Sequence, residues 1–206
     1  KPLRVAMYQR FYTGNADEGW TRLLFDNMAY SYTTVFDADI KNGKLKDFDV
    51  LILPSDSYEM LYGLQHYVDS PKYEGLMQFI GKQPPEKQSG LGDEGMNAIR
   101  SFVEKGGKLL AFNQSCDFAI EACHLKVKNL AKGLSAKEFN THGSTLRMEL
   151  DIQNPLCYGM PKEALAFHWD GPVLAVGEKF DAQLLTLSAT AFERADKVFQ
   201  VIGKTL

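Results

Sequence analysis

The stretch Gly92–Cys123, GDEGMNAIRSFVEKGGKLLAFNQSCDFAIEAC, decides the fold of this 206-residue chain. Its first part spaces apolar residues as a helix does, with Asp93 placed to cap the start and Gly106 placed to end it. A short apolar strand follows at 108–112, and a second helix begins after the polar turn 113–117. Open α/β sheets place ligands and nucleophiles where a strand feeds the amino terminus of a helix. The stretch therefore predicts an α/β fold with a site at this turn.

The segments before this stretch continue the alternation of strands and helices. Strands are predicted at residues 3–9, 30–36 and 49–54. A helix is predicted from the acidic pair Asp17-Glu18, because carboxylates favour the first turn of a helix. Residues 58–91 contain the polar breaker QPPEKQSG and predict a long loop or insertion. This order predicts a mainly parallel sheet.

The pattern changes after residue 124. Residues 144–152, STLRMELDI, alternate apolar and polar side chains, which predicts an antiparallel strand with one face in water. A turn-rich connector follows at 154–161, and further strands are predicted at 173–176, 183–187 and 198–202. The C-terminal third is therefore expected to add antiparallel strands to the parallel core.

Composition narrows the classes of partner. The formal net charge is -3, the isoelectric point is near 5.8, and no run of Lys or Arg is present, which argues against nucleic acid or an anionic membrane as partner. The longest clean apolar run, 50–53, is far short of the roughly 20 residues of a membrane helix. The amino terminus shows no signal-peptide pattern, so we expect either a cytoplasmic protein or a piece of a longer chain.

Four segments carry a resemblance to a known family: VAMYQRFYTGNADEGWTR (5–22), DFDVLILP (47–54), GLGDEGMNAIRSFVEKGGKLLAF (90–112) and NPLCYGMP (154–161). In this order they resemble the class I glutamine amidotransferase-like domain that follows the catalytic domain in some bacterial zinc carboxypeptidase-family proteins. The likeness covers most of residues 3–176, and the last stretch, from about residue 180, matches nothing in it.

The resemblance implies a flavodoxin-like three-layer sandwich, with residues 1–206 as one domain of a longer protein. It also implies a parent of the carboxypeptidase A class that is exported to the periplasm or beyond, although a cytoplasmic location stays open. The peptidase domain of the same polypeptide would then be the partner, and zinc would be bound in that domain.

The histidines argue against a zinc site in this chain itself. A carboxypeptidase zinc site needs a His and a Glu three residues apart and a distant second His, with one position left for water. None of the four histidines, at positions 66, 124, 142 and 168, begins an HxxE pattern. We therefore expect neither a metal nor another cofactor in this domain.

The turn after the strand 108–112 is where an amidotransferase carries its nucleophilic cysteine. The elbow position falls on Asn113, and a shift of two or three residues places Ser115 or Cys116 there instead. Gln114 and Asp117 stand where small residues would relieve crowding, which argues against glutaminase activity. A helix amino terminus nevertheless favours a lowered thiol pKa at Cys116, so both the structural and the reactive interpretations stay open.

Two histidines are candidates for the proton acceptor. His168 stands two residues before Asp170, as in the His-x-Glu pair of working amidotransferases, and His142 lies beside Gly143. The alternative for both is an ordinary loop position.

A second group of polar residues is expected at the rim of the sheet. Candidate binding residues are Glu18, Trp20, Arg22, Asp56 and Asn113. Glu18 and Arg22 are four residues apart, a spacing at which opposite charges pair on one helix face, so a structural role is the alternative.

These features lead to three hypotheses. The first is a non-catalytic accessory domain of a zinc carboxypeptidase-family protein, with a structural, regulatory or substrate-binding role. The second is an active hydrolase or amidotransferase-type enzyme that uses Ser115 or Cys116 with His142 or His168. The third is a small-molecule binding module similar to trehalose-utilisation-like domains, with a peptide or small molecule as ligand.

Overall fold

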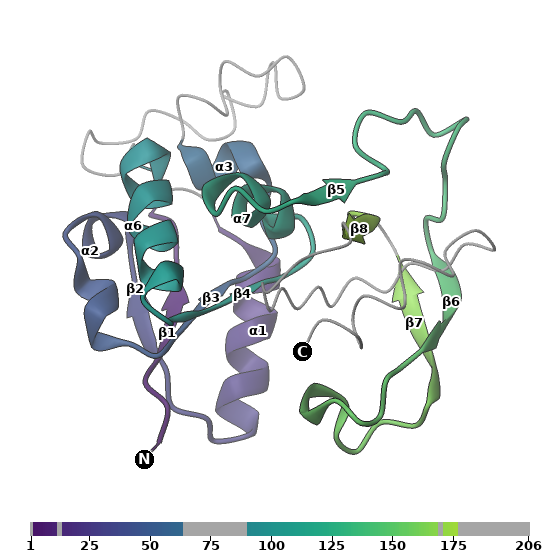
Figure 1. Ribbon diagram of the computed structural model, residues 1–206, viewed down its shortest axis with the longest axis horizontal. Coiled ribbons are helices and arrows are strands. Elements are labelled where there is room, and N and C mark those ends of the chain that lie inside the picture. The colour runs from purple at the N-terminus through teal and green to yellow at the C-terminus, as the bar shows by residue number, and fades with distance from the viewer. Residues whose placement is uncertain (1, 12–13, 64–89, 169–170, 177–206) are drawn as a thin grey trace. The chain divides into compact units, whose positions relative to one another are not determined.

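A computed structural model describes residues 2–11, 14–63, 90–168 and 171–176, and it divides into two compact units, 1–123 and 124–206 (Figure 1). The first unit contains β1 (Val5–Tyr8), α1 (Ala16–Asn27), β2 (Thr33–Val35), α2 (Asp37–Lys41), a 3-10 turn (Lys44–Asp47), β3 (Val50–Leu53), α3 (Tyr58–Tyr62), α6 (Gly92–Glu104), β4 (Lys108–Ala111) and α7 (Ser115–Ala122). The second unit contains β5 (Val127–Asn129), β6 (Ser144–Glu149), a 3-10 turn (Pro155–Cys157), β7 (Glu163–His168) and β8 (Leu174–Val176).

The first unit is built on a parallel sheet of four strands in the order β2-β1-β3-β4. This is the order of the first four strands of a flavodoxin-like sheet. All four residues of β3 are buried, as expected of a central parallel strand that is covered on both faces. The predicted α/β fold with a mainly parallel sheet is confirmed.

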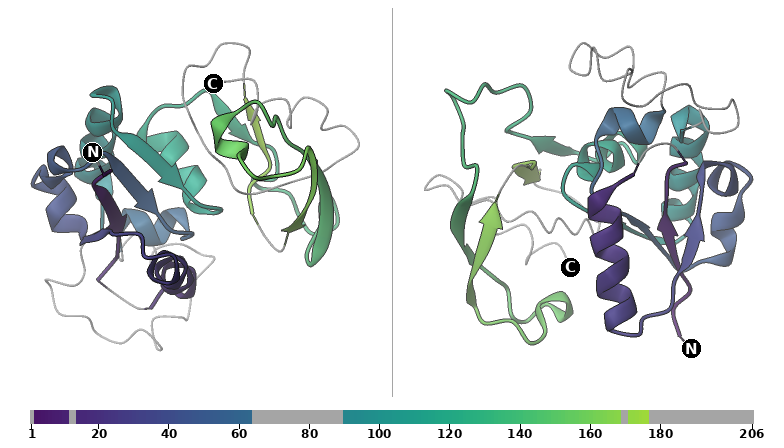
Figure 2. Two further views of the ribbon diagram at one scale, coloured as in Figure 1. Left: turned by 90° about the horizontal axis from the view of Figure 1, so that it is seen from below. Right: turned by 180° about the vertical axis from the view of Figure 1, so that it is seen from behind.

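Helices cover both faces of this sheet (Figure 2). Met7, Val50 and Ile52 point to one face, where Phe25 of α1 packs against them. Because side chains alternate along a strand, neighbours such as Leu51 point to the other face, which α2 and α6 cover. The core of the first unit is therefore a three-layer sandwich, as the resemblance implied.

Two helix starts differ in detail from the prediction. In α1 the capping residue is Asn15, whose side-chain oxygen accepts hydrogen bonds from the backbone N–H of Asp17 (3.1 Å) and of Glu18 (3.3 Å). In α6 the predicted cap by Asp93 is wrong: the residue before the helix is Leu91 and no side chain caps it. Asp93 lies in the first turn instead and accepts a hydrogen bond from the Tyr62 hydroxyl (3.0 Å).

Two short helices occur where the sequence did not predict a helix. Between the predicted strands 30–36 and 49–54 lie α2 and the 3-10 turn Lys44–Asp47, and residues 58–62, expected at the start of a long loop, form α3. The Ser57 hydroxyl caps α3 by accepting from the backbone N–H of Met60 (3.3 Å), and Leu61 is completely buried. Residues 64–89 of the predicted loop lie outside the described part of the chain.

The second unit contains two antiparallel strand pairs, β5 with β8 and β6 with β7. The strand predicted at 144–152 is confirmed over its first six residues, and the strand predicted at 173–176 is confirmed over its last three residues, as β8. Among the described residues these pairs form sheets of their own and do not extend the parallel sheet. The strands predicted at 183–187 and 198–202 lie outside the described residues.

Candidate functional site

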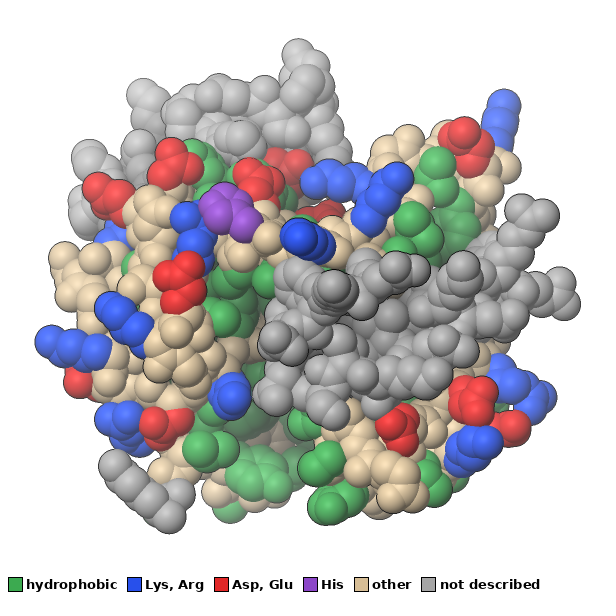
Figure 3. All heavy atoms as spheres, in the orientation of Figure 1, with side chains coloured by type: hydrophobic (Ala, Val, Ile, Leu, Met, Phe, Trp, Pro, Cys, Tyr) green, Lys and Arg blue, Asp and Glu red, His purple; other side chains and the backbone are tan. Residues whose placement is uncertain are grey.

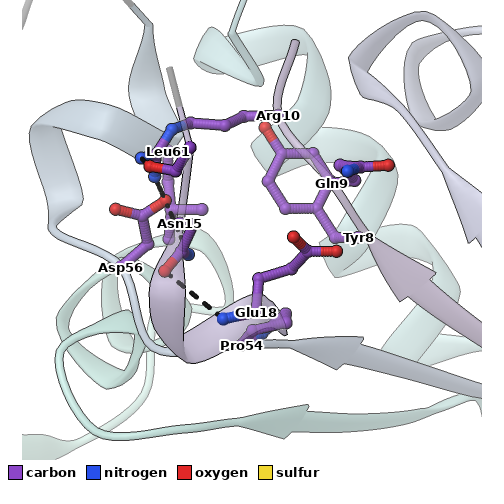
Figure 4. A pocket seen from close by; sticks show the side chains of 9 residues that line it. Tyr8, Gln9, Arg10, Asn15, Glu18, Pro54, Asp56 and Leu61 are labelled. Atoms are coloured by element: carbon purple, nitrogen blue, oxygen red, sulfur yellow. Dashed lines mark hydrogen bonds and ion pairs between the residues drawn. The ribbon is translucent and has the colours of Figure 1, made fainter. Parts of the chain in front are cut away.

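The carboxyl ends of β1 and β3 meet at the edge of the parallel sheet where the strand order reverses, which is the usual ligand position in open α/β sheets. A cavity of about 50 Å³ opens there, between the loop after β1 and the loop after β3 (Figure 4). Its lining residues are Tyr8, Gln9, Arg10, Gly14, Asn15, Glu18, Pro54, Asp56 and Leu61. A shallower pocket of about 220 Å³ shares Asn15 and Asp56 with it and is otherwise lined by Asp17, Ser55, Ser57, Met60 and Gln114.

A buried ion pair joins the two loops beside the cavity. Arg10 pairs with Asp56, and their side chains are only 6% and 11% exposed. Arg10 also donates to the carbonyl oxygen of Gly14 (2.6 Å). The Asn15 amide donates to the carbonyl oxygen of Ser55 (2.9 Å) and to the carboxylate of Asp56 (3.3 Å). The polar groups of this rim therefore hold one another in place.

The predicted pair of Glu18 and Arg22 is confirmed. The Glu18 carboxylate pairs with Nε of Arg22, and Arg22 also donates to the Thr34 hydroxyl (2.9 Å). The guanidinium of Arg22 lies 5.2 Å from the centroid of the Tyr32 ring, within cation–π range. Glu18 thus lines the cavity while its partner Arg22 is held beside β2.

The other candidate binding residues divide between the cavity and its surroundings. Asp56 lines both pockets. Glu18 lines the cavity with it, and Asp17 lines the shallower pocket with it. Trp20 is 68% exposed and lines neither pocket. Asn113 lies at the elbow and lines neither pocket, although its neighbour Gln114 lines the shallower one.

Asn113 at the elbow has a φ of 47°, in the left-handed region that only a few per cent of non-glycine residues adopt. Ser115 follows at the start of α7 and is completely buried. Its hydroxyl donates to the carbonyl oxygen of Pro54 (2.5 Å) and accepts from the backbone N–H of Asp56 (2.9 Å). Ser115 therefore fastens the elbow to the loop that carries Asp56.

Cys116 is also completely buried, and its thiol contacts the carbonyl oxygen of Ala111 (3.3 Å). Burial raises the pKa of the Cys116 thiol to about 12, opposite to the lowering that a helix amino terminus favours. Desolvation outweighs the helix dipole here because the side chain points into the core. The thiol is protonated at neutral pH.

The candidate histidines lie in the second unit. His168 ends β7, is 5% exposed, and its Nδ1 lies 2.6 Å from the Thr141 hydroxyl. His142 is exposed in the turn before β6. Ser115 and Cys116 belong to the first unit, so a pairing of either with a histidine stays a prediction. Asp170 lies outside the described residues.

Comparison with known proteins adds little to this geometry. No protein-family model matches the chain, and no curated protein matches it. One similar solved structure is a Thermoplasma acidophilum protein described as a candidate GMP synthase subunit, at 10% sequence identity and a TM-score of 0.46. The match covers 84% of this chain and 68% of that one.

Several residues of the site were not predicted from the sequence. Arg10 and Asn15 line the cavity, as does Tyr8, whose hydroxyl donates to the completely buried carboxylate of Asp37 (2.5 Å). Their positions contained a usable signal, because Tyr8 ends β1 and Arg10 follows two residues later, at the edge where β3 also ends.

Metal ligation and membrane crossing each require a particular arrangement of residues. Residues 2–11, 14–63, 90–168 and 171–176 contain no group of three or more His, Cys, Asp or Glu side chains arranged to hold a metal ion. None of the helices described here has the length and apolar character needed to cross a membrane.

We expect Cys116 to resist alkylation in the native protein. A thiol with a pKa near 12 is ionised to only about one part in ten thousand at pH 8, and its burial also excludes the reagent. Iodoacetamide treatment followed by peptide mass spectrometry should find Cys116 unmodified in buffer and fully modified in denaturant. Modification of native Cys116 at the rate of a free cysteine would contradict its burial.

Proposed function

We propose that this chain is a non-catalytic, amidotransferase-like domain that binds a small polar ligand in the cavity between the loops after β1 and β3. The position of the cavity supports this, because ligands of doubly wound sheets bind at such a reversal of strand order. Its lining supports it too: Arg10 and Glu18 are each 8% exposed, and charged side chains that are nearly buried beside a cavity are more typical of sites than of cores.

The hydrogen bonds of Ser115 are the main support for the proposal that the domain has no catalytic activity. A nucleophilic serine needs its hydroxyl free to attack a substrate and hydrogen-bonded to a general base. The Ser115 hydroxyl instead donates to the Pro54 carbonyl and accepts from the Asp56 N–H. The alternative nucleophile, Cys116, is held as a buried thiol. Both side chains therefore have a structural role in the elbow.

The resemblance supplies the proposed context: an accessory domain of a zinc carboxypeptidase-family protein, with the peptidase domain of the same polypeptide as partner. The visible face in Figure 3 is compatible with a small-molecule or protein partner, because positive and negative side chains are interspersed on it. A large surface of one sign, as nucleic acid favours, is not seen on that face.

Glutaminase and esterase assays on the purified protein test the proposal. We expect no turnover above the buffer blank for the wild type, and the same result for the Ser115→Ala and Cys116→Ala variants. Turnover by the wild type that either substitution abolishes would overturn the non-catalytic assignment. A thermal-shift screen of sugars, amines and peptides tests the binding part, and a complete absence of stabilisation would count against it.

A further inference from the structure

We propose that the group bound in the cavity is a protonated amine, held by the carboxylates of Glu18 and Asp56. This inference rests on the proposed function, since it names the chemical class of the ligand at the same site. Figure 4 shows the Glu18 carboxylate directed into the space that Tyr8, Arg10 and Asn15 also border, whereas the Gln9 amide points away from it.

The hydrogen-bonding groups around the cavity are unbalanced. Its charged and amide donors point to groups within the rim: Arg10 donates to Gly14 and forms an ion pair with Asp56 through Nη1, which makes no hydrogen bond with a described residue, and the Asn15 amide donates to Ser55 and Asp56. The groups left to meet a ligand are mainly acceptors. A ligand that supplies donors therefore fits this lining better than one that supplies acceptors.

Glu18 shows the imbalance most clearly. The residue is 8% exposed, and one of its carboxylate oxygens, Oε1, pairs with Arg22. No described residue donates a hydrogen bond to the second oxygen, Oε2. Little water reaches a carboxylate on a residue that is 8% exposed, so a donor supplied by a ligand would stabilise it. An ammonium group offers three N–H donors and a charge of the right sign.

The charge of the lining also favours a cation. Asp17, Glu18 and Asp56 line the two adjoining pockets, and Arg10 is the single cationic side chain among the lining residues, already paired with Asp56. An anionic ligand would meet the nearly buried carboxylates of Glu18 and Asp56, where charge interactions are weakly screened, and Asp17 at the exposed rim. A metal ion is disfavoured, because the described residues provide no cluster of three suitable ligands.

The volumes indicate how such a ligand would lie. The cavity of about 50 Å³ accommodates an ammonium group, since one water-sized sphere needs about 10–15 Å³ on the same measure. The remainder of the ligand would extend into the adjoining pocket of about 220 Å³, which presents Asp17, Ser57 and Gln114 together with the apolar Met60. A primary amine on a short chain matches this shape, whether from an amino sugar, a diamine or the amino terminus of a peptide.

Matched pairs of probes test the charge requirement on the full chain. Isothermal titration calorimetry at low ionic strength would compare 1,5-diaminopentane with 1,5-pentanediol, and glucosamine with glucose. We expect binding by the amine of each pair and at least tenfold weaker binding by the neutral partner. Glycinamide adds a pH test: its α-amino group titrates near pH 8, so its binding should fall as the pH rises through that value.

A matched pair of variants tests the site. Glu18→Gln keeps the shape of the side chain and removes its charge, and we expect it to weaken diamine binding about tenfold or more. Glu94→Gln removes the same charge from an exposed position on α6, away from the cavity, and should leave binding unchanged. If Glu18→Gln does not fold by circular dichroism, Asp17→Asn at the exposed rim replaces it, with an expected loss of about threefold.

The outcomes separate this inference from the proposed function. Equal binding by the neutral probes, or equal effects of Glu18→Gln and Glu94→Gln, would overturn the amine assignment while leaving a ligand site at the cavity. Binding by none of the probes would overturn the amine assignment as well. The broader thermal-shift screen would then decide whether the cavity binds any ligand. Selective binding by the amines, lost in Glu18→Gln alone, is the expected result.

Discussion

Replacing Arg10 with Met is expected to lower the free energy of unfolding by about 3–5 kcal/mol. Arg10 and Asp56 form an ion pair whose side chains are 6% and 11% exposed, so neither charge has bulk water as an alternative partner. Methionine fills much of the same volume but leaves the Asp56 carboxylate with the Asn15 amide and the Ser57 N–H as its remaining donors. Removing one member of a buried pair leaves the other charge uncompensated, which costs more than the pair itself contributes.

Urea denaturation followed by circular dichroism measures this loss, and two further variants interpret it. Arg4→Met breaks the more exposed pair of Arg4 with Asp49, in which the side chains are 45% and 35% exposed, and should cost much less. The double variant Arg10→Met/Asp56→Asn should recover part of the loss, because no unpaired buried charge remains. Equal losses for Arg10→Met and Arg4→Met would show that the Arg10–Asp56 pair is not buried as described.

Replacing Phe118 with Ala is expected to lower the free energy of unfolding by a similar amount, about 3–5 kcal/mol. Phe118 is completely buried on α7, and its ring centroid lies 5.7 Å from that of Tyr58 on α3. The substitution removes apolar contacts and leaves a cavity beneath the helix that carries Ser115 and Cys116. We therefore also expect faster alkylation of Cys116, since local opening of α7 is what exposes it.

The matched control for Phe118 is Ile120→Ala on the same helix. Ile120 is only partly buried, so its truncation should cost clearly less in the same denaturation experiment. Both variants should be compared by iodoacetamide labelling of Cys116 under native conditions. Equal stability losses, or unchanged labelling in Phe118→Ala, would contradict the packing of α7 against α3.

Much of the first unit could be predicted from local patterns. The continuous apolar run in β3 and the acidic start of α1 each identify an element from neighbouring residues alone. The short helices α2 and α3 were missed, because five residues hold too little periodicity to distinguish a helix from a turn.

The second unit was harder to predict. In β7 the larger apolar residues Leu165 and Phe167 are 69% and 67% exposed, while the small Ala164 and Ala166 occupy the more buried face. This arrangement reverses the usual pattern in which large apolar residues mark the buried face of a strand, so the strand was not recognised. The partner strand β6 follows the usual pattern and was recognised.

The candidate site was predicted in part. Glu18 and Asp56 were identified because they follow strands or start helices at the carboxyl edge of the sheet, and the cavity brings both into one lining. Arg10 and Asn15 were missed although both follow closely on the end of β1, because their importance comes from Asp56, a residue more than forty positions away. The sequence contains no local mark of such a partnership.

Local sequence alone determines the strand–turn–helix at 108–122, because apolar spacing, Gly106 and the polar turn act between neighbours. Whether the side chains of that turn are reactive depends on the tertiary structure. The Ser115 hydroxyl forms hydrogen bonds with backbone groups of Pro54 and Asp56, which are 61 and 59 residues away. Cys116 is removed from water by the packing of α7. Reactivity is governed by solvation and by hydrogen-bond partners, and both are set by which distant segments meet when the sheet assembles.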